Sequence, residues 1–315
     1  MARCFVTHSL PGQALERLRA RHETDVWPDE EPPTREQLIE HAREADGLLC
    51  LLTDRIDREL LAQLPRLRAI SNYAVGWDNI DIEAASERGI RVGNTPDVLT
   101  DATADLTFGL MLAAARRVAE GDQVVRAGEW GTWSPDFLLG TDVHGATLGI
   151  VGMGRIGSAV AARAQGFEMT VIHTGRTGGT PLNDVFRQAD FVSLHVPLTP
   201  ETRGMIGAEA LRAMQPSAIL INTARGPIVD TDALVAALEA GEIAGCGLDV
   251  TDPEPLPGDH PLLGAPGAVI TPHIGSASRQ AREAMAGLAV DNLLAALDGE
   301  PMPAQVEPAA GASRD

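Results

Sequence analysis

Apolar runs and runs with helical periodicity alternate along almost the whole chain of 315 residues. In the first hundred residues, GLLCLL (47–52) and AISNYA (69–74) are each followed by a helical run. A second series of such pairs begins at ATLGIV (146–151) and ends at GAVIT (267–271). Strands that alternate with helices form parallel sheets covered by helices on both faces. Because the chain is long enough for two cores, we predict an α/β protein with two domains.

The segment 100–127 separates the two series, and its first half is apolar on nearly every side, with Leu106, Phe108 and Met111 among its residues. A helix without a polar face has to be buried, so we expect this segment between domains or in a subunit interface. After the second series the chain ends in a predicted helix, roughly Ser278–Leu297. The tail that follows is rich in proline and alanine, and we expect it to be disordered.

The composition is strongly acidic: the formal net charge is −19, and all 25 basic residues are arginine. A coding bias explains the absence of lysine better than function does. Such a charge argues against nucleic acid or an anionic membrane as a partner. An anionic substrate would therefore need a local positive pocket that opposes the overall field.

Cys4, Cys50 and Cys246 are isolated thiols in apolar runs, without the spacing of metal ligands. They indicate buried, inert cysteines and a reducing cytosol. The N-terminus lacks the charged and then apolar pattern of an export signal. No apolar run is long enough to span a membrane. We therefore expect a cytoplasmic protein without a metal site.

Gly152, Gly154 and Gly157 form a G-x-G-x-x-G pattern that directly follows ATLGIV. The pattern alone is weak, but an alanine-rich helical run begins at once after it. Glycines in this place let the backbone turn tightly and approach a pyrophosphate, whose charge lies at the helix N-terminus. This context favours a dinucleotide-binding loop over a plain glycine turn. Arg155 either faces the phosphates or is a surface arginine.

Three side chains with acid, base or charge chemistry each follow one of the later apolar runs. Arg225 follows SAILIN, Glu254 follows GCGLDV and His273 follows GAVIT. The carboxyl ends of parallel strands meet at one edge of a sheet, so these side chains should converge beside the glycine loop. Individually they could be a surface charge, a solvated loop acid and a helix cap. Their shared position argues against three coincidences.

This set of side chains suits the reduction of a 2-oxo acid. A nicotinamide hydride adds to the carbonyl carbon, and the developing oxyanion must be protonated. Histidine suits the acid role because its unperturbed pKa is about 6.5, and a neighbouring carboxylate favours its charged form. A guanidinium can bind the substrate carboxylate and polarise the carbonyl. His195 also follows an apolar run and ranks below His273 as the acid.

At these residues the sequence resembles the D-isomer-specific 2-hydroxyacid dehydrogenases, and most closely their glyoxylate/hydroxypyruvate reductase branch. The similarity covers nearly the whole chain. It is carried, in the family's order and spacing, by NYAVGWDNID, RGIRVGNTPDVLTDATADL, GTDVHGATLGIVGMGRIG, INTARGPIVD, GLDVTDPEPLP and PHIGSA.

The resemblance implies two Rossmann-like or flavodoxin-like domains with parallel sheets and the active site in the cleft between them. Residues 1–97 and 274–315 would form a discontinuous substrate domain, and residues 98–273 the dinucleotide-binding domain. The family forms homodimers through the long helix, here the region Thr100–Ala127. In the closest branch a tryptophan that matches Trp133 reaches the neighbour's active site, although ordinary interface packing explains this residue nearly as well.

The family's catalytic residues match Arg225, Glu254 and His273. The substrate carboxylate would meet the backbone N–H groups of Val75 and Gly76. Leu52 suggests a small pocket wall, but it could equally belong to the core. The expected cofactor-binding residues are Gly152, Met153, Gly154, Arg155, Ile156, Gly157, Thr174, Gly175, Arg176, Thr177, Pro197, Thr202, Thr103, Thr223, Ala224, Asp249, Gly275 and Ser276.

One position indicates which dinucleotide is preferred. NAD-using relatives carry an acid at the place of Gly175, where it accepts hydrogen bonds from the ribose and repels a 2′-phosphate. Glycine removes that repulsion, and Arg176 can pair with the phosphate. We therefore predict NADPH as the preferred cofactor, with a dual-specificity enzyme that also uses NADH as the alternative. Beyond Arg176, between TGRTGG (174–179) and NDVFRQAD (183–190), the chain is shorter than in most relatives, which usually carry another short strand there.

We predict reduction of small 2-oxo acids, glyoxylate and hydroxypyruvate, to D-2-hydroxy acids. One alternative is a reductase of 2-ketogluconate or another 2-oxo acid on the same frame. Phosphoglycerate dehydrogenases often have extra C-terminal domains, and formate dehydrogenases have glutamine at the position of Glu254, which disfavours both. A further alternative is a non-catalytic dinucleotide-sensing protein, as among the family's transcriptional corepressors, which can retain the same three residues.

Overall fold

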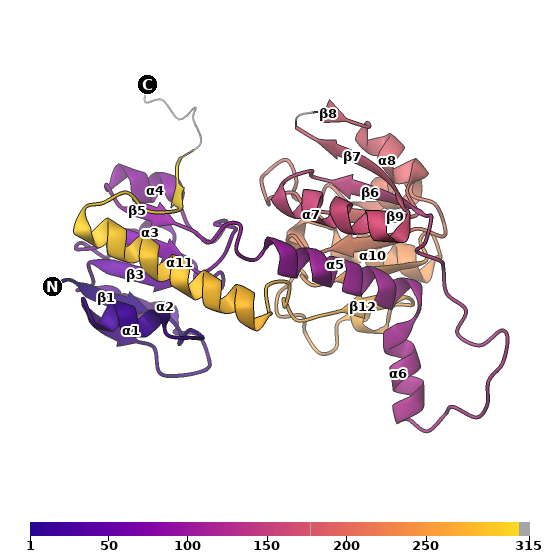
Figure 1. Ribbon diagram of the computed structural model, residues 1–315, viewed down its shortest axis with the longest axis horizontal. Coiled ribbons are helices and arrows are strands. Elements are labelled where there is room, and N and C mark those ends of the chain that lie inside the picture. The colour runs from indigo at the N-terminus through magenta and orange to yellow at the C-terminus, as the bar shows by residue number, and fades with distance from the viewer. Residues whose placement is uncertain (177, 309–315) are drawn as a thin grey trace. The chain divides into compact units, whose positions relative to one another are not determined.

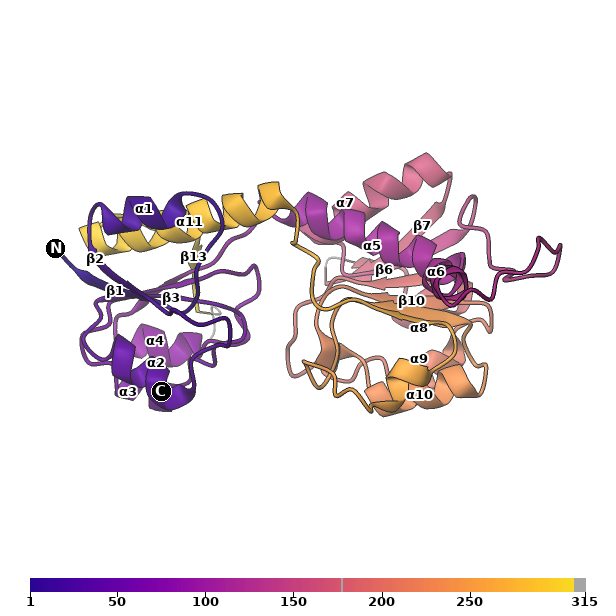
Figure 2. The same ribbon diagram turned by 90° about the horizontal axis from the view of Figure 1, so that it is seen from below.

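The computed structural model describes residues 1–176 and 178–308 (Figure 1). Contacts along the chain divide it into two compact units. The first unit combines Met1–Leu99 with the chain from Ala277 onward, and the second unit is Thr100–Ser276. Each unit is built around one sheet with helices on both faces (Figure 2).

Among the described residues, the first unit contains a six-stranded sheet. Its strands are β1 (Arg3–Val6), β2 (Glu23–Val26), β3 (Gly47–Cys50), β4 (Ala69–Asn72), β5 (Arg91–Gly93) and β13 (Gln305–Val306). Their order is β13-β5-β4-β3-β1-β2. Strands β1 to β5 pair in parallel, and β13 pairs antiparallel with β5.

Two groups of helices cover this sheet. The helices are α1 (Ala14–Arg19), α2 (Arg35–Ala42), α3 (Arg58–Ala62), α4 (Ile82–Glu87) and α11 (Arg279–Asp298). Helices α1 and α11 lie on one face, and α2, α3 and α4 lie on the other (Figure 2). Four of them begin at a side chain that accepts a hydrogen bond from a backbone N–H of the first turn, namely Thr34, Asp57, Asp81 and Ser278. Such caps satisfy donors that a helix start leaves unpaired.

In the part of the chain that the structure describes, the second unit has a seven-stranded sheet. Its strands are β6 (Thr147–Val151), β7 (Thr170–Gly175), β8 (Gly178–Gly179), β9 (Phe191–Leu194), β10 (Ile219–Asn222), β11 (Gly245–Leu248) and β12 (Ala268–Ile270). The order is β12-β11-β10-β9-β6-β7-β8, with β8 antiparallel to β7 and the other pairs parallel.

Alternate residues of the second sheet point to opposite faces and enter two cores. Ile221 packs against the helices on one face of the sheet, whereas its neighbour Leu220 packs against the helices on the other face. The helices are α5 (Thr100–Ala115) and α7 (Arg155–Ala164) on one face, and α8 (Leu182–Gln188), α9 (Ala208–Ala213) and α10 (Thr231–Glu239) on the other. The remaining helices are α6 (Val118–Arg126) and the short 3₁₀ segments η1 (Gln165–Phe167), η2 (Gly226–Ile228) and η3 (Pro261–Gly264).

Both sheets reverse their strand order beside their first strand. In the second unit β6 lies between β9 and β7, and in the first unit β1 lies between β3 and β2. Ligands of open α/β sheets bind at the carboxyl ends of strands next to such a reversal. The predicted fold class, α/β with two predominantly parallel sheets, is confirmed.

Two details of the prediction were wrong. The segment 100–127 is not one helix, because Arg117 adopts a left-handed φ of 51° and separates α5 from α6. The tail is partly ordered, since Gln305 and Val306 pair with β5; the expected disorder of 309–315 concerns residues outside the described ones. The short strand β8 lies within TGRTGG, before the shortened stretch, so it does not bear on that expectation.

Two further features bear on the sequence analysis. None of the described helices combines the length and the apolar character that a membrane crossing requires. Cys4, Cys50 and Cys246 are buried and unpaired. Burial raises the pKa of the Cys246 thiol to about 12, which makes it an inert thiol at neutral pH.

Candidate active site

The glycine loop joins the end of β6 to the start of α7. Gly152 adopts a left-handed φ of 99°, and a Cβ atom there would lie 2.7 Å from the carbonyl oxygen of His195. A Cβ atom on Gly157 would lie 2.2 Å from the carbonyl oxygen of Gly152. Both positions therefore require glycine: the first for the turn, and the second for the close packing of α7 onto this loop.

Gly154 is open to a ligand. It is the N-cap residue of α7 and offers no side chain to the first turn. No described atom lies within 4 Å of the place where its Cβ would be. The space beside Gly154, at the start of α7, is therefore not filled by any described atom. A pyrophosphate fits this place, because a helix N-terminus carries partial positive charge and unpaired donors.

The end of β7 lies beside this loop, because the Gly152 N–H donates to the carbonyl oxygen of Thr174 at 2.9 Å. Gly175 is exposed, and the nearest atom to a Cβ placed on it would be the backbone nitrogen of Met153, at 3.7 Å. The next residue, Arg176, is exposed in the turn toward β8. Thr177, also expected to bind the cofactor, lies outside the described residues.

Arg225, Glu254 and His273 follow three adjacent strands, β10, β11 and β12. The Nδ1 atom of His273 lies 2.6 Å from Oε1 of Glu254. Burial acts to raise the pKa of Glu254, but the hydrogen bond and charge of His273 and the charge of Arg225 outweigh it, so this pKa lies below its ordinary value. Glu254 is therefore ionised at neutral pH and accepts the hydrogen bond from Nδ1. This leaves Nε2 of His273 for a ligand.

The turn that carries Arg225 is held by Asn222, the buried last residue of β10. Its Nδ2 donates to the carbonyl oxygen of Arg225 at 2.9 Å, and its Oδ1 accepts from the Ala224 N–H at 3.0 Å. The hydroxyl oxygens of Thr223 and Thr107 lie 3.0 Å apart, which ties the same turn to α5. The expected residues Thr223, Ala224 and Arg225 therefore lie in one rigid turn.

The turn that carries His273 is held by Asp249, which is only 1% exposed. Its Oδ1 accepts from the Thr271 hydroxyl at 2.6 Å and the Ile274 N–H at 2.8 Å, and its Oδ2 accepts from the Gly275 N–H at 2.6 Å. The His273 N–H donates to the carbonyl oxygen of Asp249 at 2.9 Å. These bonds hold His273 at a φ of 54°, a conformation that residues other than glycine rarely adopt.

Sequence reasoning placed Asp249 among the cofactor-binding residues and missed its part in positioning His273. It also missed Asn222. Both residues share a signal that could have found them: each is a polar residue at or directly after the end of an apolar strand run. In a parallel sheet such a residue can bond the turns that follow the neighbouring strands.

The loop after β9 contains Pro197 and Thr202, and the Thr202 hydroxyl donates to the carbonyl oxygen of Pro197 at 2.7 Å. At the start of this loop, Nε2 of His195 lies 2.8 Å from the Ser193 hydroxyl. Burial lowers the pKa of His195 to about 4, so its ring is neutral at neutral pH.

Two more expected cofactor residues lie close to Asp249. Thr103 is buried on α5, and its Cγ2 would lie 3.5 Å from a Cβ placed on Gly275. Ser276 is the last residue of the second unit. These positions and the turns after β10, β11 and β12 gather at one end of the second sheet.

The substrate residues expected in the first unit lie after β3 and β4. Leu52, Val75 and Gly76 are all half-buried. Within the described part of the chain, the backbone N–H groups of Val75 and Gly76 donate no hydrogen bond. Two such adjacent donors can bind one carboxylate.

Two asparagines connect these loops. Asn79 Nδ2 donates to the carbonyl oxygens of Leu51 and Asp54, each at 3.0 Å. These two bonds hold the chain on both sides of Leu52. Asn72 Nδ2 donates to the carbonyl oxygen of Gly76 at 2.8 Å and to Oδ1 of Asn79 at 3.0 Å. The two loops are therefore one hydrogen-bonded assembly.

Trp133, in contrast, lies far from any core. It follows α6 in a long loop that projects from the second unit (Figure 1), and it is 78% exposed. The described part of this chain leaves its indole ring uncovered.

Comparison with known proteins agrees with this geometry. The sequence model of the D-isomer specific 2-hydroxyacid dehydrogenase NAD binding domain matches residues 108–275. A curated glyoxylate reductase from Korarchaeum cryptofilum (strain OPF8) is 49% identical over 310 residues, which are 95% of this chain and 93% of the relative. The chain belongs to the D-isomer specific 2-hydroxyacid dehydrogenase family. This confirms the family predicted from the sequence motifs.

Solved structures superpose on nearly the whole chain. A protein from Thermus thermophilus has a TM-score of 0.93 and 52% identity, covering 97% of this chain and 100% of that chain. An NADPH-dependent glyoxylate/hydroxypyruvate reductase from Sinorhizobium meliloti, in complex with NADP and malonate, has a TM-score of 0.85 and 34% identity, covering 97% of this chain and 96% of that chain.

Family membership identifies the chain as a nicotinamide-dinucleotide-dependent dehydrogenase. The matched NAD binding domain includes the glycine loop and the turns with Arg225, Glu254 and His273. The dinucleotide therefore belongs to the second unit, where the start of α7 is open to a pyrophosphate.

Proposed function

We propose that the chain reduces glyoxylate and hydroxypyruvate to D-2-hydroxy acids, with NADPH as the preferred cofactor. The observation that carries this proposal is the 2.6 Å contact between His273 Nδ1 and Glu254 Oε1, at the strand ends beside the glycine loop. The substrate class is supported by the K. cryptofilum relative, named a glyoxylate reductase, and by the S. meliloti glyoxylate/hydroxypyruvate reductase.

Each residue has a defined task in the proposed reaction. The bound nicotinamide supplies a hydride to the carbonyl carbon of the substrate. His273, charged before transfer, donates the proton on Nε2 to the carbonyl oxygen and becomes neutral. Glu254 holds the ring through Nδ1 and stabilises its charged form. Arg225 binds the substrate carboxylate and polarises the carbonyl. In the first unit, the N–H groups of Val75 and Gly76 are donors suited to a carboxylate.

The preference for NADPH rests on the end of β7. Gly175 carries no carboxylate that would repel a 2′-phosphate, and Arg176 beside it is exposed and positively charged. A guanidinium pairs with phosphate through parallel hydrogen bonds. The turn lies next to the glycine loop through the bond between Gly152 and Thr174, so a dinucleotide on that loop would bring its ribose close to Arg176.

Steady-state kinetics with glyoxylate test both parts of the proposal. We expect kcat/KM to be higher with NADPH than with NADH, and Arg176→Asp to reverse the preference by at least about tenfold because an acid repels the 2′-phosphate. Arg212→Asp, on the exposed side of α9, is the matched control and should leave the ratio unchanged. A higher kcat/KM with NADH in the unmodified chain would contradict the cofactor assignment, and absence of turnover would contradict the activity.

We further propose that the chain acts as a homodimer that buries α6 and the loop after it. In the described second unit α6 has no buried residue. Its Val118 and Val125 are 55% and 56% exposed, and Trp130 and Trp133 in the following loop are 62% and 78% exposed. Large apolar side chains that are exposed close together in the sequence, as in this segment, are typical of a protein interface. In such a dimer Trp133 would contribute to the partner's substrate pocket.

The proposal also covers the role of the first unit and the location of the protein in the cell. The first unit would bind the substrate through the loops after β3 and β4. The three buried, unpaired cysteines support a location in the reducing cytoplasm.

A further inference from the structure

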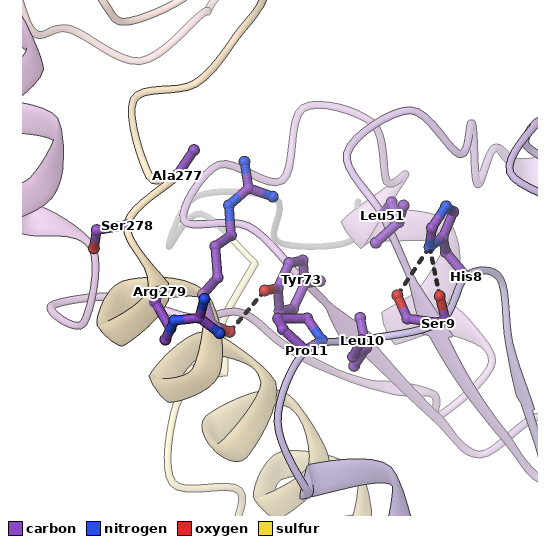
Figure 3. Close-up of a pocket in the computed structure, with 10 residues that line it drawn as sticks. His8, Ser9, Leu10, Pro11, Leu51, Tyr73, Ala277, Ser278 and Arg279 are labelled. Carbon is purple, nitrogen blue, oxygen red and sulfur yellow. Dashed lines mark hydrogen bonds between the residues drawn. The ribbon is translucent and has the colours of Figure 1, made fainter.

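The first unit contains a cavity of about 580 Å³ to which the proposed reaction assigns no ligand (Figure 3). Its wall is formed by His8 after β1, by Leu51 after β3, by Tyr73 after β4 and by the start of α11 with Arg279 and Arg282. This volume lies within the range of small-molecule sites. All these residues belong to the first unit, so the cavity is a property of that unit alone.

The charge of the cavity opposes that of the whole chain. The chain carries 44 acidic and 25 basic residues, yet the ten described residues that line the cavity include two arginines and no acid. Among the described residues, neither Arg279 nor Arg282 forms an ion pair with a carboxylate. The Nε of Arg282 is shielded from solvent and has no hydrogen-bond partner in the described structure. The cavity is therefore a local positive site.

The positions of these arginines on α11 are electrostatically unfavourable without a ligand. Arg279 is the first residue of α11 and Arg282 is three positions later, so the two like charges are neighbours on the helix surface. They also lie at the positive end of the dipole of a 20-residue helix, whose first turn holds no acidic residue. An anion in the cavity would relieve both effects at once.

The site is joined to the loops that would bind the substrate. Leu51, in the cavity wall, directly precedes Leu52, and Tyr73 precedes Val75 by two positions. The Tyr73 hydroxyl donates to the carbonyl oxygen of Arg282 at 2.7 Å, and its ring centroid lies 6.0 Å from the guanidinium carbon of Arg282. Tyr73 thus links the start of α11 to the turn that carries Val75 and Gly76.

We propose that this cavity binds a phosphate or carboxylate group through Arg279, Arg282 and the N-terminus of α11. The group has two possible sources: the distal acid of a longer 2-oxo acid, or a separate small anion. The binding of the anion itself does not depend on the proposed function, whereas the first source does.

Calorimetric titration of the full chain with inorganic phosphate tests the site. Arg279 is exposed, so Arg279→Gln removes a charge without opening the core. We expect this variant to weaken phosphate binding by about tenfold, the loss of one charge-assisted contact, and Arg282→Gln to do the same. Arg21→Gln, which removes an exposed guanidinium bonded to Asp298 on the same unit, is the control and should bind like the unmodified chain.

Two results would overturn the proposal. One is equal phosphate binding by the unmodified chain and by the Arg279→Gln/Arg282→Gln double variant. The other is an equal loss in Arg21→Gln, which would indicate a general charge effect. Thermal unfolding of each variant verifies that it is folded. If Arg282→Gln does not fold, the comparison of Arg279→Gln with the unmodified chain tests the proposal by itself.

Kinetics distinguish the two sources. If the group belongs to the substrate, Arg279→Gln lowers kcat/KM for oxaloacetate, a 2-oxo acid with a second carboxylate, about tenfold more than for glyoxylate. If the anion is a separate molecule, Arg279→Gln changes kcat/KM for the two substrates by the same factor. Phosphate then also changes kcat/KM for both substrates in the unmodified chain. Absence of turnover with either substrate would refute the proposed reductase but leave the calorimetric result standing.

Discussion

At the scale of single residues, two carboxylates position His273 in different ways. Glu254 binds the ring, through Nδ1 at 2.6 Å, whereas the Asp249 carboxylate accepts from the Thr271 hydroxyl before the histidine and from the backbone N–H groups of Ile274 and Gly275 after it. The ring contact orients the group that would transfer the proton. The backbone contacts hold the left-handed turn that brings the ring there. Neither carboxylate can replace the other, because they act on different atoms.

His195 predicts a dependence of stability on pH. Its folded-state pKa of about 4 lies below the unfolded value near 6.5, so the unfolded chain binds the extra proton as the pH falls. The stability that neutral His195 contributes is complete above about pH 6.5 and is lost as the pH falls toward about 4, roughly 3 kcal/mol in all. Urea unfolding at several pH values should show a smaller loss in His195→Gln than in the unmodified chain.

His144→Gln is the control, because this histidine side chain is 70% exposed. The free energy of unfolding of His144→Gln should equal that of the unmodified chain at every pH. Equal acid sensitivity of His195→Gln and the unmodified chain would contradict the lowered pKa of His195.

The positions of residues that directly follow apolar strands could be predicted from the sequence, whereas the contacts that residues make between turns could not. Arg225, Glu254 and His273 follow apolar runs, so the sheet edge at which they meet can be read from the sequence. The tasks of Asn222 and Asp249 depend on the path of three neighbouring turns, which a linear sequence does not show. For the same reason the Asn72–Asn79 pair was not foreseen.

At the scale of secondary structure, strands that form continuous apolar runs were predicted, including the edge strand β12, whereas the edge strands β2, β8 and β13 were not. The strands β3, β4, β9 and β10 are buried throughout and appear as continuous apolar runs. Strand β2 lies at a sheet edge with the sequence ETDV and alternating exposure, so no apolar run marks it. Strands β8 and β13 are two residues long and arise only because a neighbouring strand offers hydrogen bonds.

The glycine loop yields a prediction at this scale. In Gly154→Ala the new methyl group meets no described atom within 4 Å, so the free energy of unfolding without cofactor should change by less than about 0.5 kcal/mol. The methyl group would occupy the space of the pyrophosphate, so the Kd of the dinucleotide should rise by at least about tenfold. Fluorescence titration and urea unfolding measure the two quantities.

Gly109→Ala is a suitable control, because it adds a methyl group at another open position, on α5. Its dinucleotide Kd should equal that of the unmodified chain. If Gly154→Ala bound the dinucleotide normally, the start of α7 would not be the pyrophosphate site.

At the scale of the whole molecule, each unit places its candidate residues at the carboxyl ends of its strands. The second unit carries the dinucleotide loop and the three proposed catalytic residues, and the first carries the loops with Leu52 and Gly76. The net charge of −19 disfavours anions in general, so recognition of an acid depends on local arginines. Arg225 and the pair Arg279 and Arg282 are two such local sites, one in each unit.

Self-association is the prediction that belongs to this scale. Sedimentation velocity at micromolar concentration should give twice the mass of the 33.2 kDa chain. Replacing Trp130 and Trp133 with serine should shift the equilibrium toward the monomer, because it removes apolar area from the proposed interface. Replacing Leu263, an exposed residue of η3, with serine is the control and should leave the dimer intact. A monomeric unmodified chain would contradict the proposed dimer.

The central claim, that His273 protonates the substrate, is tested most directly by the kcat of His273→Gln with glyoxylate and NADPH. Glutamine keeps a polar side chain of similar size but cannot supply the proton. We expect kcat to fall by about 10²- to 10⁴-fold, the usual contribution of a general acid, while the Kd of NADPH changes little. A kcat within about threefold of the unmodified chain, with the same Kd, would show that another group is the acid.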